Sequence, residues 1–202
     1  MKEALIIFVR RPELGKVKTR LASSIGDNAA LFIYNKLLQH TKVISAITKT
    51  HKFIFYNEQI EKEDIWNGAD YSKRIQNKDD LGGKMKVAFN EVFTIGYGKA
   101  VIIGSDCLEL TAEIIIEAFQ KLESTDLVIG PAKDGGYYLL GMKEIENRLF
   151  DNIVWSTETV YAETIERIKI SNKTYSVLPL LNDIDTINDL SEALLKEISI
   201  NL

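Results

Sequence analysis

Apolar runs alternate along the chain with segments in which apolar residues recur at helical spacing. The runs ALIIFV (4–9), KAVII (99–103) and DLVIG (126–130) are short and rich in β-branched side chains. Such runs are typical of strands that are buried on both faces, as in a parallel sheet. Further strands are predicted within KFIFY (52–56), DGGYYLLGM (134–142) and KTYSVLPL (173–180).

Five segments have the pattern of helices. Thr111 is expected to cap the third of them, and Ser156 or Thr157 the fourth. The polar and poorly periodic residues 57–80 predict a loop with short elements. The predicted helices cover residues 27–48, 82–95, 112–124, 157–169 and 186–198.

This alternation of strands and helices predicts an α/β fold with a mostly parallel sheet. The crossovers between parallel strands are expected to be right-handed. Ligands of such folds bind outside the carboxyl ends of the strands. The segments that reach this edge are 9–20, 104–109, 130–137 and 182–186.

Composition narrows the class of protein. The 202 residues, 46% hydrophobic and 27% charged, suit one globular domain over residues 1–202. The net charge of -4 argues against a nucleic-acid partner, because binding to a phosphate backbone favours basic domains. The single cysteine excludes an internal disulfide, and no apolar run is long enough for a membrane span. A cytoplasmic location is therefore expected.

The segment VRRPELGKVKTRLA (9–22), which we call the first loop, concentrates positive charge in an acidic protein. Gly15 permits a tight turn, and Lys16, Lys18 and Arg20 could donate charge-assisted hydrogen bonds to phosphate. No Walker A or G-x-G-x-x-G pattern occurs. The alternative interpretation is a solvated, lysine-rich turn.

Acidic residues follow two of the later strands. Asp106 comes just after a buried run, where a carboxylate can bind Mg²⁺, although an Asp bonded to turn amides fits equally well. Asp183 and Asp185 are two apart and would face the same side of an extended segment. One of them could be a second metal ligand. The alternative is a cluster that starts the last helix with Thr186 and Asp189.

Other candidates are weaker when each is taken alone. Asp134 and the two glycines after it suit a hairpin turn, but the tyrosines beside them could bind a sugar or a base. Trp155 is more often a core residue than a stacking platform. The two histidines lie far from any suitable partner, so neither zinc nor a catalytic triad is expected. Cys107 is expected to be a small buried residue.

The combination is more informative than its parts. Basic residues on the first loop and acidic residues on later strand ends would meet at one edge of the sheet. This arrangement suits a nucleoside polyphosphate, whose charge is neutralised directly by the basic residues and through Mg²⁺ or Mn²⁺ by the acidic ones.

The chain resembles the DUF2064 family in five sequence motifs. These motifs are FVRRPELGKVKTRLA, IGSDCLEL, GPAKDGGYYLLG, WST and DIDTINDL. The resemblance extends from Ile7 to about Leu190. This family consists of GT-A-type transferases that are described as glycosyltransferases. It is related to nucleotidyltransferases such as the molybdenum-cofactor and phospholactate guanylyltransferases.

The resemblance implies a single-domain, Rossmann-like GT-A fold with a mostly parallel sheet and helices on both faces. It implies metal binding by Asp106 with Asp185 or Asp183, and catalytic roles for Asp106, Asp134, Lys18 and Arg20. The implied nucleotide-binding residues are Arg10, Gly15, Lys16, Lys18, Arg20, Gly82, Lys84 and Ser105. The implied acceptor-binding residues are Gly135, Gly136, Tyr137, Trp155 and Ser156.

Two departures from the family pattern stand out. Leu108 replaces a proline that the family usually has, which is expected to loosen the turn after Asp106. In DDLGGKM (79–85), Asp79 replaces a glycine and Lys84 replaces an arginine. Lys84 keeps the positive charge but cannot donate in a bidentate manner, so the nucleotide preference is expected to differ.

The expected function is that of a Mg²⁺-dependent transferase that uses a nucleotide or nucleotide-sugar and a small-molecule acceptor. In the first version, it is a glycosyltransferase. In the second, it is a guanylyl- or cytidylyl-type nucleotidyltransferase that releases pyrophosphate. The rivals from other classes are a nucleotide-binding module without catalysis and a structural protein without a small ligand.

Overall fold

The computed structural model describes residues 1–201, and in this range the chain forms seven strands, six α-helices and two short 3₁₀ helices. The strands are β1 (Glu3–Val9), β2 (His51–Tyr56), β3 (Tyr71–Ile75), β4 (Lys99–Ile103), β5 (Leu127–Pro131), β6 (Tyr137–Met142) and β7 (Tyr175–Val177). The helices are α1 (Thr19–Ile25), α2 (Asp27–Ile47), α3 (Leu81–Thr94), α4 (Ala112–Ser124), η1 (Asn147–Leu149), α5 (Val160–Ile170), η2 (Ile187–Asp189) and α6 (Glu192–Asn201).

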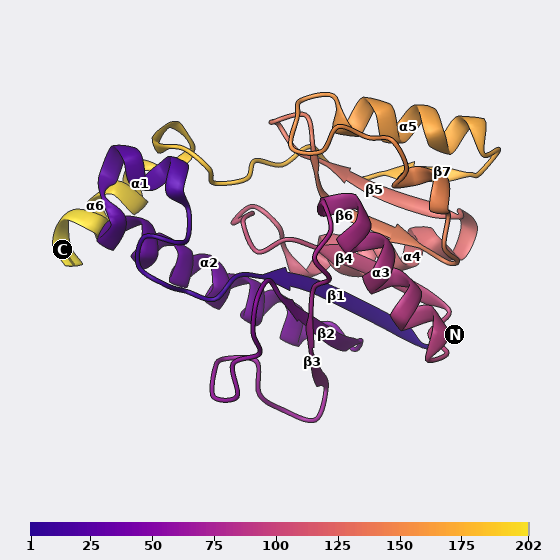
Figure 1. Ribbon diagram of the computed structural model, residues 1–202, viewed down its shortest axis with the longest axis horizontal. Coiled ribbons are helices and arrows are strands. Elements are labelled where there is room, and N and C mark those ends of the chain that lie inside the picture. Colours follow the sequence, from indigo (N-terminus) through magenta and orange to yellow (C-terminus); the bar gives the residue numbers. More distant parts are fainter. Residues whose placement is uncertain (202) are drawn as a thin grey trace.

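The strands form one sheet in the order β3-β2-β1-β4-β6-β5-β7 (Figure 1). β6 pairs antiparallel with β4 and β5, and the remaining pairs are parallel. The prediction of an α/β fold with a mostly parallel sheet is therefore confirmed.

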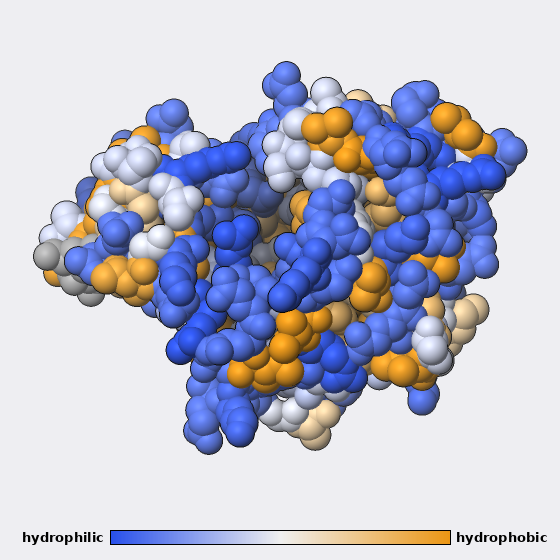
Figure 2. Space-filling view, in the orientation of Figure 1, coloured by the Kyte–Doolittle hydropathy of each residue, from blue (hydrophilic) through white to orange (hydrophobic). Residues whose placement is uncertain are grey.

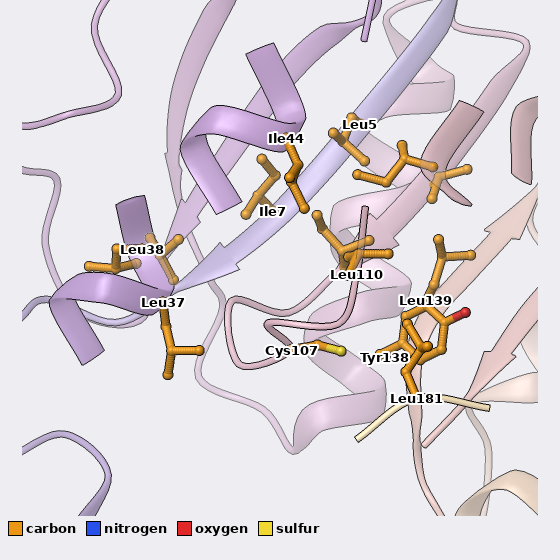
Figure 3. Packing of buried hydrophobic residues seen from close by; sticks show 14 of the residues in the cluster. Leu5, Ile7, Leu37, Leu38, Ile44, Cys107, Leu110, Tyr138, Leu139 and Leu181 are labelled. Atoms are coloured by element: carbon orange, nitrogen blue, oxygen red, sulfur yellow. The ribbon is translucent and has the colours of Figure 1, made fainter. Parts of the chain in front are cut away.

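Apolar side chains of each central strand alternate between two cores. On β1, Leu5 and Ile7 face α2 and α4, whereas Ala4 and Ile6 face α3 and α5. Figure 3 shows Ile44 of α2 beside Leu5 and Ile7 of β1, with Leu37 and Leu38 on the same helix. This alternation explains why the central strands read as continuous apolar runs, since both faces of the sheet are covered by helices.

One strand and one α-helix were not predicted. β3 lies in the segment expected to be mostly loop, and its sequence YSKRI is partly exposed along the strand. It is an edge strand, so it has one neighbour and tolerates polar side chains. α1 is a seven-residue helix that begins within the first loop and ends at Ile25, and its sequence TRLASSI buries only Leu21.

The helix starts agree with the prediction in part. The Thr111 hydroxyl accepts a hydrogen bond from the Ile114 amide, as a cap of α4 does. α5 begins at Val160, later than predicted, because the Thr157 hydroxyl donates to the Val154 carbonyl instead of capping the helix. The predicted closing helix is split into η2 and α6. Thr186 and Asp189 form a capping box that starts η2, and this 3₁₀ helix ends after one turn. Within the described residues, no helix is both long and apolar enough to cross a membrane.

Candidate functional site

A cavity of about 1000 Å³ lies at the carboxyl edge of the sheet. Its walls come from the first loop, from the ends of β1, β2 and β4, from α3, and from the segments around residues 134–138, 155–160 and 183–185. Figure 2 shows a hollow near the middle of the visible face, with mainly hydrophilic residues around it. Most of the predicted site residues line this cavity: Arg10, Lys18, Arg20, Lys84, Ser105, Asp106, Asp134, Gly136, Tyr137, Trp155, Ser156, Asp183 and Asp185.

The first loop turns its two central lysines in opposite directions. Gly15 has a φ of 75°, which favours glycine, and the loop is closed by a bond from the Lys16 amide to the Glu13 carbonyl. The exposed Lys16 side chain pairs with Glu13 at 2.9 Å and does not line the cavity. Lys18, with a φ of 48°, turns inward instead. Of the two lysines, only Lys18 is placed where the sequence predicted.

The Lys18 ammonium lies between two carboxylates, an arrangement that we call the Lys18 bridge. Its Nζ is 2.9 Å from Asp106 Oδ1 and 2.9 Å from Asp185 Oδ1, and the side chain is only 5% exposed. Burial alone would lower the pKa of Lys18, but the two carboxylates outweigh burial and raise it. Lys18 is therefore charged at neutral pH, and it holds the first loop against the two later strand ends.

Two more charged groups lie beside the Lys18 bridge. Arg20 is 4.0 Å from Asp185 and its side chain is 74% exposed, so it can turn toward a ligand. Burial, with the nearby charges of Asp106 and Asp134, raises the pKa of Asp183 to about 7. Asp185 is thus the carboxylate that shares a cation with Asp106, whereas Asp183 is nearer to its neutral form.

The segment 183–189 is held at the site by a backbone hydrogen bond and by the Asp189 carboxylate. The Ile184 amide donates to the Asp106 carbonyl at 2.9 Å. The Asp189 carboxylate accepts from the backbone amides of Asp185 and Thr186 at 3.1 and 2.7 Å. Asp189 itself does not line the cavity. The helix-start cluster that was the alternative to metal binding therefore exists. It is built on the Asp189 carboxylate, and it leaves the Asp185 carboxylate free to pair with Lys18.

Tyr34 is a site residue that the sequence reasoning missed. Its hydroxyl accepts from the Arg10 amide at 2.8 Å and donates to the Arg10 carbonyl at 3.0 Å. Burial raises the pKa of Tyr34 to about 12, so the hydroxyl stays protonated. The sequence did contain a signal for this role, because Tyr34 lies on the apolar face of the helix predicted over 27–48. A buried tyrosine hydroxyl usually needs a polar partner.

The ends of β2 and β3 add polar residues that were also missed. Asn57, Glu58 and Gln76 line the cavity. Asn57 Oδ1 accepts from the Arg11 amide at 3.2 Å, and Gln76 Nε2 donates to the Phe55 carbonyl at 2.9 Å. The rule that selected the other strand ends would have found Gln76 as well, had β3 been recognised as a strand.

The opposite wall is built from the Asp134 turn and the segment before α5. Asp134 Oδ1 accepts from the Gly136 amide at 2.9 Å, which leaves its second oxygen free. Gly135 has a φ of 87° and lies against the Glu158 carbonyl, where any side chain would overlap the backbone. Gly135 therefore serves packing and does not line the cavity, in contrast to Gly136.

The contact between Trp155 and Gly82 gives the glycine a packing role instead of the predicted nucleotide-binding role. A Cβ added at Gly82 would overlap the Trp155 ring, which itself lines the cavity. Gly82 was expected to contact the nucleotide, but it lies outside the cavity wall and lets Trp155 pack directly on α3. The indole Nε1 is buried and has no hydrogen-bond partner in the described structure. Lys84, two residues further along α3, does line the cavity.

Cys107 lies in the core beside the acidic turn. It is 6% exposed, and burial raises the pKa of its thiol to about 12. Its side chain points toward Tyr138 and Leu181 (Figure 3). Leu108, the next residue, packs partly against the same core.

The carboxylates of the cavity suit a hard cation such as Mg²⁺ only if a substrate supplies further oxygen ligands. Among residues 1–200, no three His, Cys, Asp or Glu side chains are grouped to hold a metal ion. Asp106 and Asp185 supply two carboxylates that share one cation. Mg²⁺ is commonly bound by one or two carboxylates together with substrate phosphates and water, so the residues fit that mode of binding.

Comparison with known proteins identifies the family. A family model described as "Uncharacterized protein conserved in bacteria (DUF2064)" matches residues 41–157. No functionally curated protein matches the sequence.

Solved structures with the same fold cover nearly the whole chain. A crystal structure described as that of a "putative nucleotide-diphospho-sugar transferase" from Desulfovibrio desulfuricans G20 matches with 30% identity and a TM-score of 0.88. The match covers 99% of this chain and 96% of that one.

Two more distant structures show the fold alone. The inositol-1-phosphate CTP transferase from T. maritima has 14% identity and a TM-score of 0.61, over 100% of this chain and 98% of that one. The 4-diphosphocytidyl-2C-methyl-D-erythritol synthase from Anaerococcus prevotii DSM 20548 has 9% identity and a TM-score of 0.60, over 98% and 95%. The chain therefore belongs to the DUF2064 family and has the fold of the nucleotide-diphospho-sugar transferases.

Proposed function

We propose that this protein is a Mg²⁺-dependent glycosyltransferase that moves a sugar from a nucleotide-diphospho-sugar to a hydroxyl of a small acceptor. The observation that carries the proposal is the cavity in which cations of the first loop face the carboxylates of Asp106, Asp134, Asp183 and Asp185. The similarity to the Desulfovibrio structure, over nearly the full length of both chains, supports a nucleotide-using transferase.

The cations are placed to bind the diphosphate of the donor. Lys18 and Arg20 lie beside Asp185, and Arg10 and Lys84 line the same cavity. Within residues 1–200, Arg10 and Lys84 form no ion pair with another side chain, so both can meet an anionic ligand. Charge-assisted hydrogen bonds from such groups stabilise the diphosphate more as it leaves, because it gains negative charge when its bond to the sugar breaks.

Asp106 and Asp185 would hold the metal ion. When bound, Mg²⁺ supplies charge neutralisation on the diphosphate oxygens. Asp185 is chosen as the second ligand because its carboxylate shares the Lys18 ammonium with Asp106. Ser105, buried next to Asp106, and Tyr34 would fix the floor on which the phosphates lie.

Asp134 would act on the acceptor. One of its oxygens is occupied by the Gly136 amide, and the other can accept the proton of an acceptor hydroxyl. The acceptor oxygen then bonds to the anomeric carbon, the bond from that carbon to the diphosphate breaks, and the nucleoside diphosphate leaves. Trp155, Ser156 and Tyr137 would form the wall against which the acceptor is positioned.

A nucleotidyltransferase is the second candidate. Distant structures with the same fold are named as CTP-using enzymes, among them the inositol-1-phosphate CTP transferase. In that case a phosphorylated acceptor would attack the α-phosphate of a nucleoside triphosphate, and pyrophosphate would leave. The same cations and carboxylates would serve both reactions.

Product analysis separates the two candidates. The protein is incubated with Mg²⁺ and either UDP- and GDP-sugars or nucleoside triphosphates with sugar phosphates, with water serving as a slow acceptor. We expect release of nucleoside diphosphate from one nucleotide-sugar, reduced by at least about tenfold in Asp106→Asn. Pyrophosphate release would replace the first candidate by the second. Absence of both products would contradict a transferase function and favour a module that only binds nucleotide.

A further inference from the structure

The Lys18 bridge occupies the place between the two carboxylates that are proposed to hold the metal. Lys18 Nζ is 2.9 Å from one oxygen of each carboxylate. The lysine side chain is 5% exposed, whereas the side chains of Asp106 and Asp185 are 43% and 41% exposed. The lysine side chain is therefore almost shielded from solvent, whereas both carboxylates are partly exposed, and all three residues line the cavity.

We propose that Lys18 is a built-in counter-ion that makes metal binding depend on the nucleotide. In the free protein, the ammonium neutralises Asp106 and Asp185 and keeps a divalent cation from binding tightly. Phosphate oxygens then draw Lys18 away from the carboxylates, and the metal binds together with the nucleotide. This inference rests on the proposed function, because it needs a polyphosphate ligand at the same site.

Electrostatic repulsion supports exclusion of the free metal. Mg²⁺ requires oxygen ligands at about 2.1 Å, which is shorter than the bonds that the two carboxylates make to the ammonium. A metal bound to both carboxylates would then lie within a few ångströms of the Lys18 charge. In a partly buried site, two like charges at such a distance repel strongly. Metal binding therefore requires the lysine to move or to lose much of its interaction with the carboxylates.

Charge counting explains why the nucleotide is needed. Asp106, Asp185 and Lys18 together carry one negative charge, and a divalent ion would reverse its sign. A di- or triphosphate supplies the missing negative charge and new hydrogen-bond acceptors for the ammonium. The charges of the metal ion and the phosphates then compensate one another, so the two are expected to bind together.

The first loop gives the lysine a route to the phosphates. Lys18 has a left-handed backbone conformation, with φ 48° and ψ 45°, which is strained for a residue other than glycine. Its neighbour Arg20 is exposed and only loosely associated with Asp185 at 4.0 Å. A small rearrangement of this loop would bring the Lys18 ammonium from the carboxylates to a phosphate in the cavity.

Titration with Mn²⁺ alone tests the proposal without any turnover. Binding is measured by the electron paramagnetic resonance signal of free Mn²⁺ for the wild-type protein and for Lys18→Met and Lys18→Gln. We expect both variants to bind one Mn²⁺ at least about tenfold more tightly than the wild type. Lys16→Met, which removes an equal charge from the exposed side of the same loop, is expected to leave the affinity unchanged.

Two further variants define where the ion binds. Adding Asp106→Asn to Lys18→Met is expected to abolish the gain in affinity, and circular dichroism verifies that each variant is folded. Equal affinity in the wild type and both Lys18 variants, or a gain that survives Asp106→Asn, would overturn the proposal. The proposed function fails separately, if no nucleotide stabilises the wild-type protein.

Discussion

At the scale of single residues, backbone conformation decides which side chains reach the cavity. Lys16 and Lys18 are the same residue type in one loop, yet one pairs with Glu13 at the surface and the other with Asp106 and Asp185. The sequence predicted the charge and its place after β1. It placed both lysines among the nucleotide-binding residues, because their directions depend on the turn at Gly15 and on the left-handed conformation of Lys18.

Gly82 is a second residue whose role the sequence could not determine. In a helix, replacement of glycine by alanine usually stabilises by up to about 1 kcal/mol. At Gly82 the added methyl group would overlap the Trp155 ring, so we predict that Gly82→Ala destabilises the fold by about 1–3 kcal/mol in urea unfolding.

Two comparisons make the Gly82 prediction specific. In a Trp155→Ala background, Gly82→Ala is expected to become neutral or stabilising, because the obstacle is gone. Gly83→Ala, whose neighbour is the exposed side chain of Asp79, is expected to cost little in the wild type. A destabilisation by Gly82→Ala that persists without the indole would refute the packing role.

At the scale of elements, apolar patterns located the buried strands better than the polar segments. β1, β4 and β5 were predicted close to their observed bounds, because both faces of each are covered by helices. β3 was missed because an edge strand does not need a continuous apolar run. The start of α5 was predicted too early, because Thr157 bonds to a carbonyl of the preceding turn.

The segment before α6 places Asp185 by means of a residue outside the cavity. Asp189 accepts hydrogen bonds from the Asp185 and Thr186 amides, and from the side chains of Thr186 and Asn182. We predict that Asp189→Ala lowers the free energy of unfolding by about 1–3 kcal/mol and weakens nucleotide binding as well. Urea unfolding and calorimetric titration measure the two effects.

A nearby acidic residue provides the control for this prediction. Glu192 is exposed in the first turn of α6, and Glu192→Ala is expected to change stability by less than about 0.5 kcal/mol. An Asp189→Ala protein that is destabilised but binds nucleotide with wild-type affinity would show that Asp189 has no part in positioning Asp185.

At the scale of the whole molecule, the sheet brings together segments that are far apart in the sequence. Lys18 and Asp185 are 167 residues apart, and the parallel strands carry both to one edge. The general rule for α/β sheets therefore predicted most of the cavity wall. It did not predict the contribution of β3, nor the packing of Trp155 on α3, because these depend on pairing and contacts that no local pattern encodes.

The central claim is that this edge binds a nucleotide together with a divalent cation. A ligand at about 100 times its Kd stabilises a protein by about 2.7 kcal/mol, which corresponds to about 5–10 °C in Tm for a chain of this size.

The most direct measurement is a thermal-shift screen of GTP, CTP, UTP and UDP- and GDP-sugars, each with and without Mg²⁺. We predict that at least one nucleotide raises Tm in a Mg²⁺-dependent manner, that Asp106→Asn loses this increase, and that Lys16→Met retains it. A wild-type protein that no nucleotide stabilises in the presence of Mg²⁺ would contradict the account.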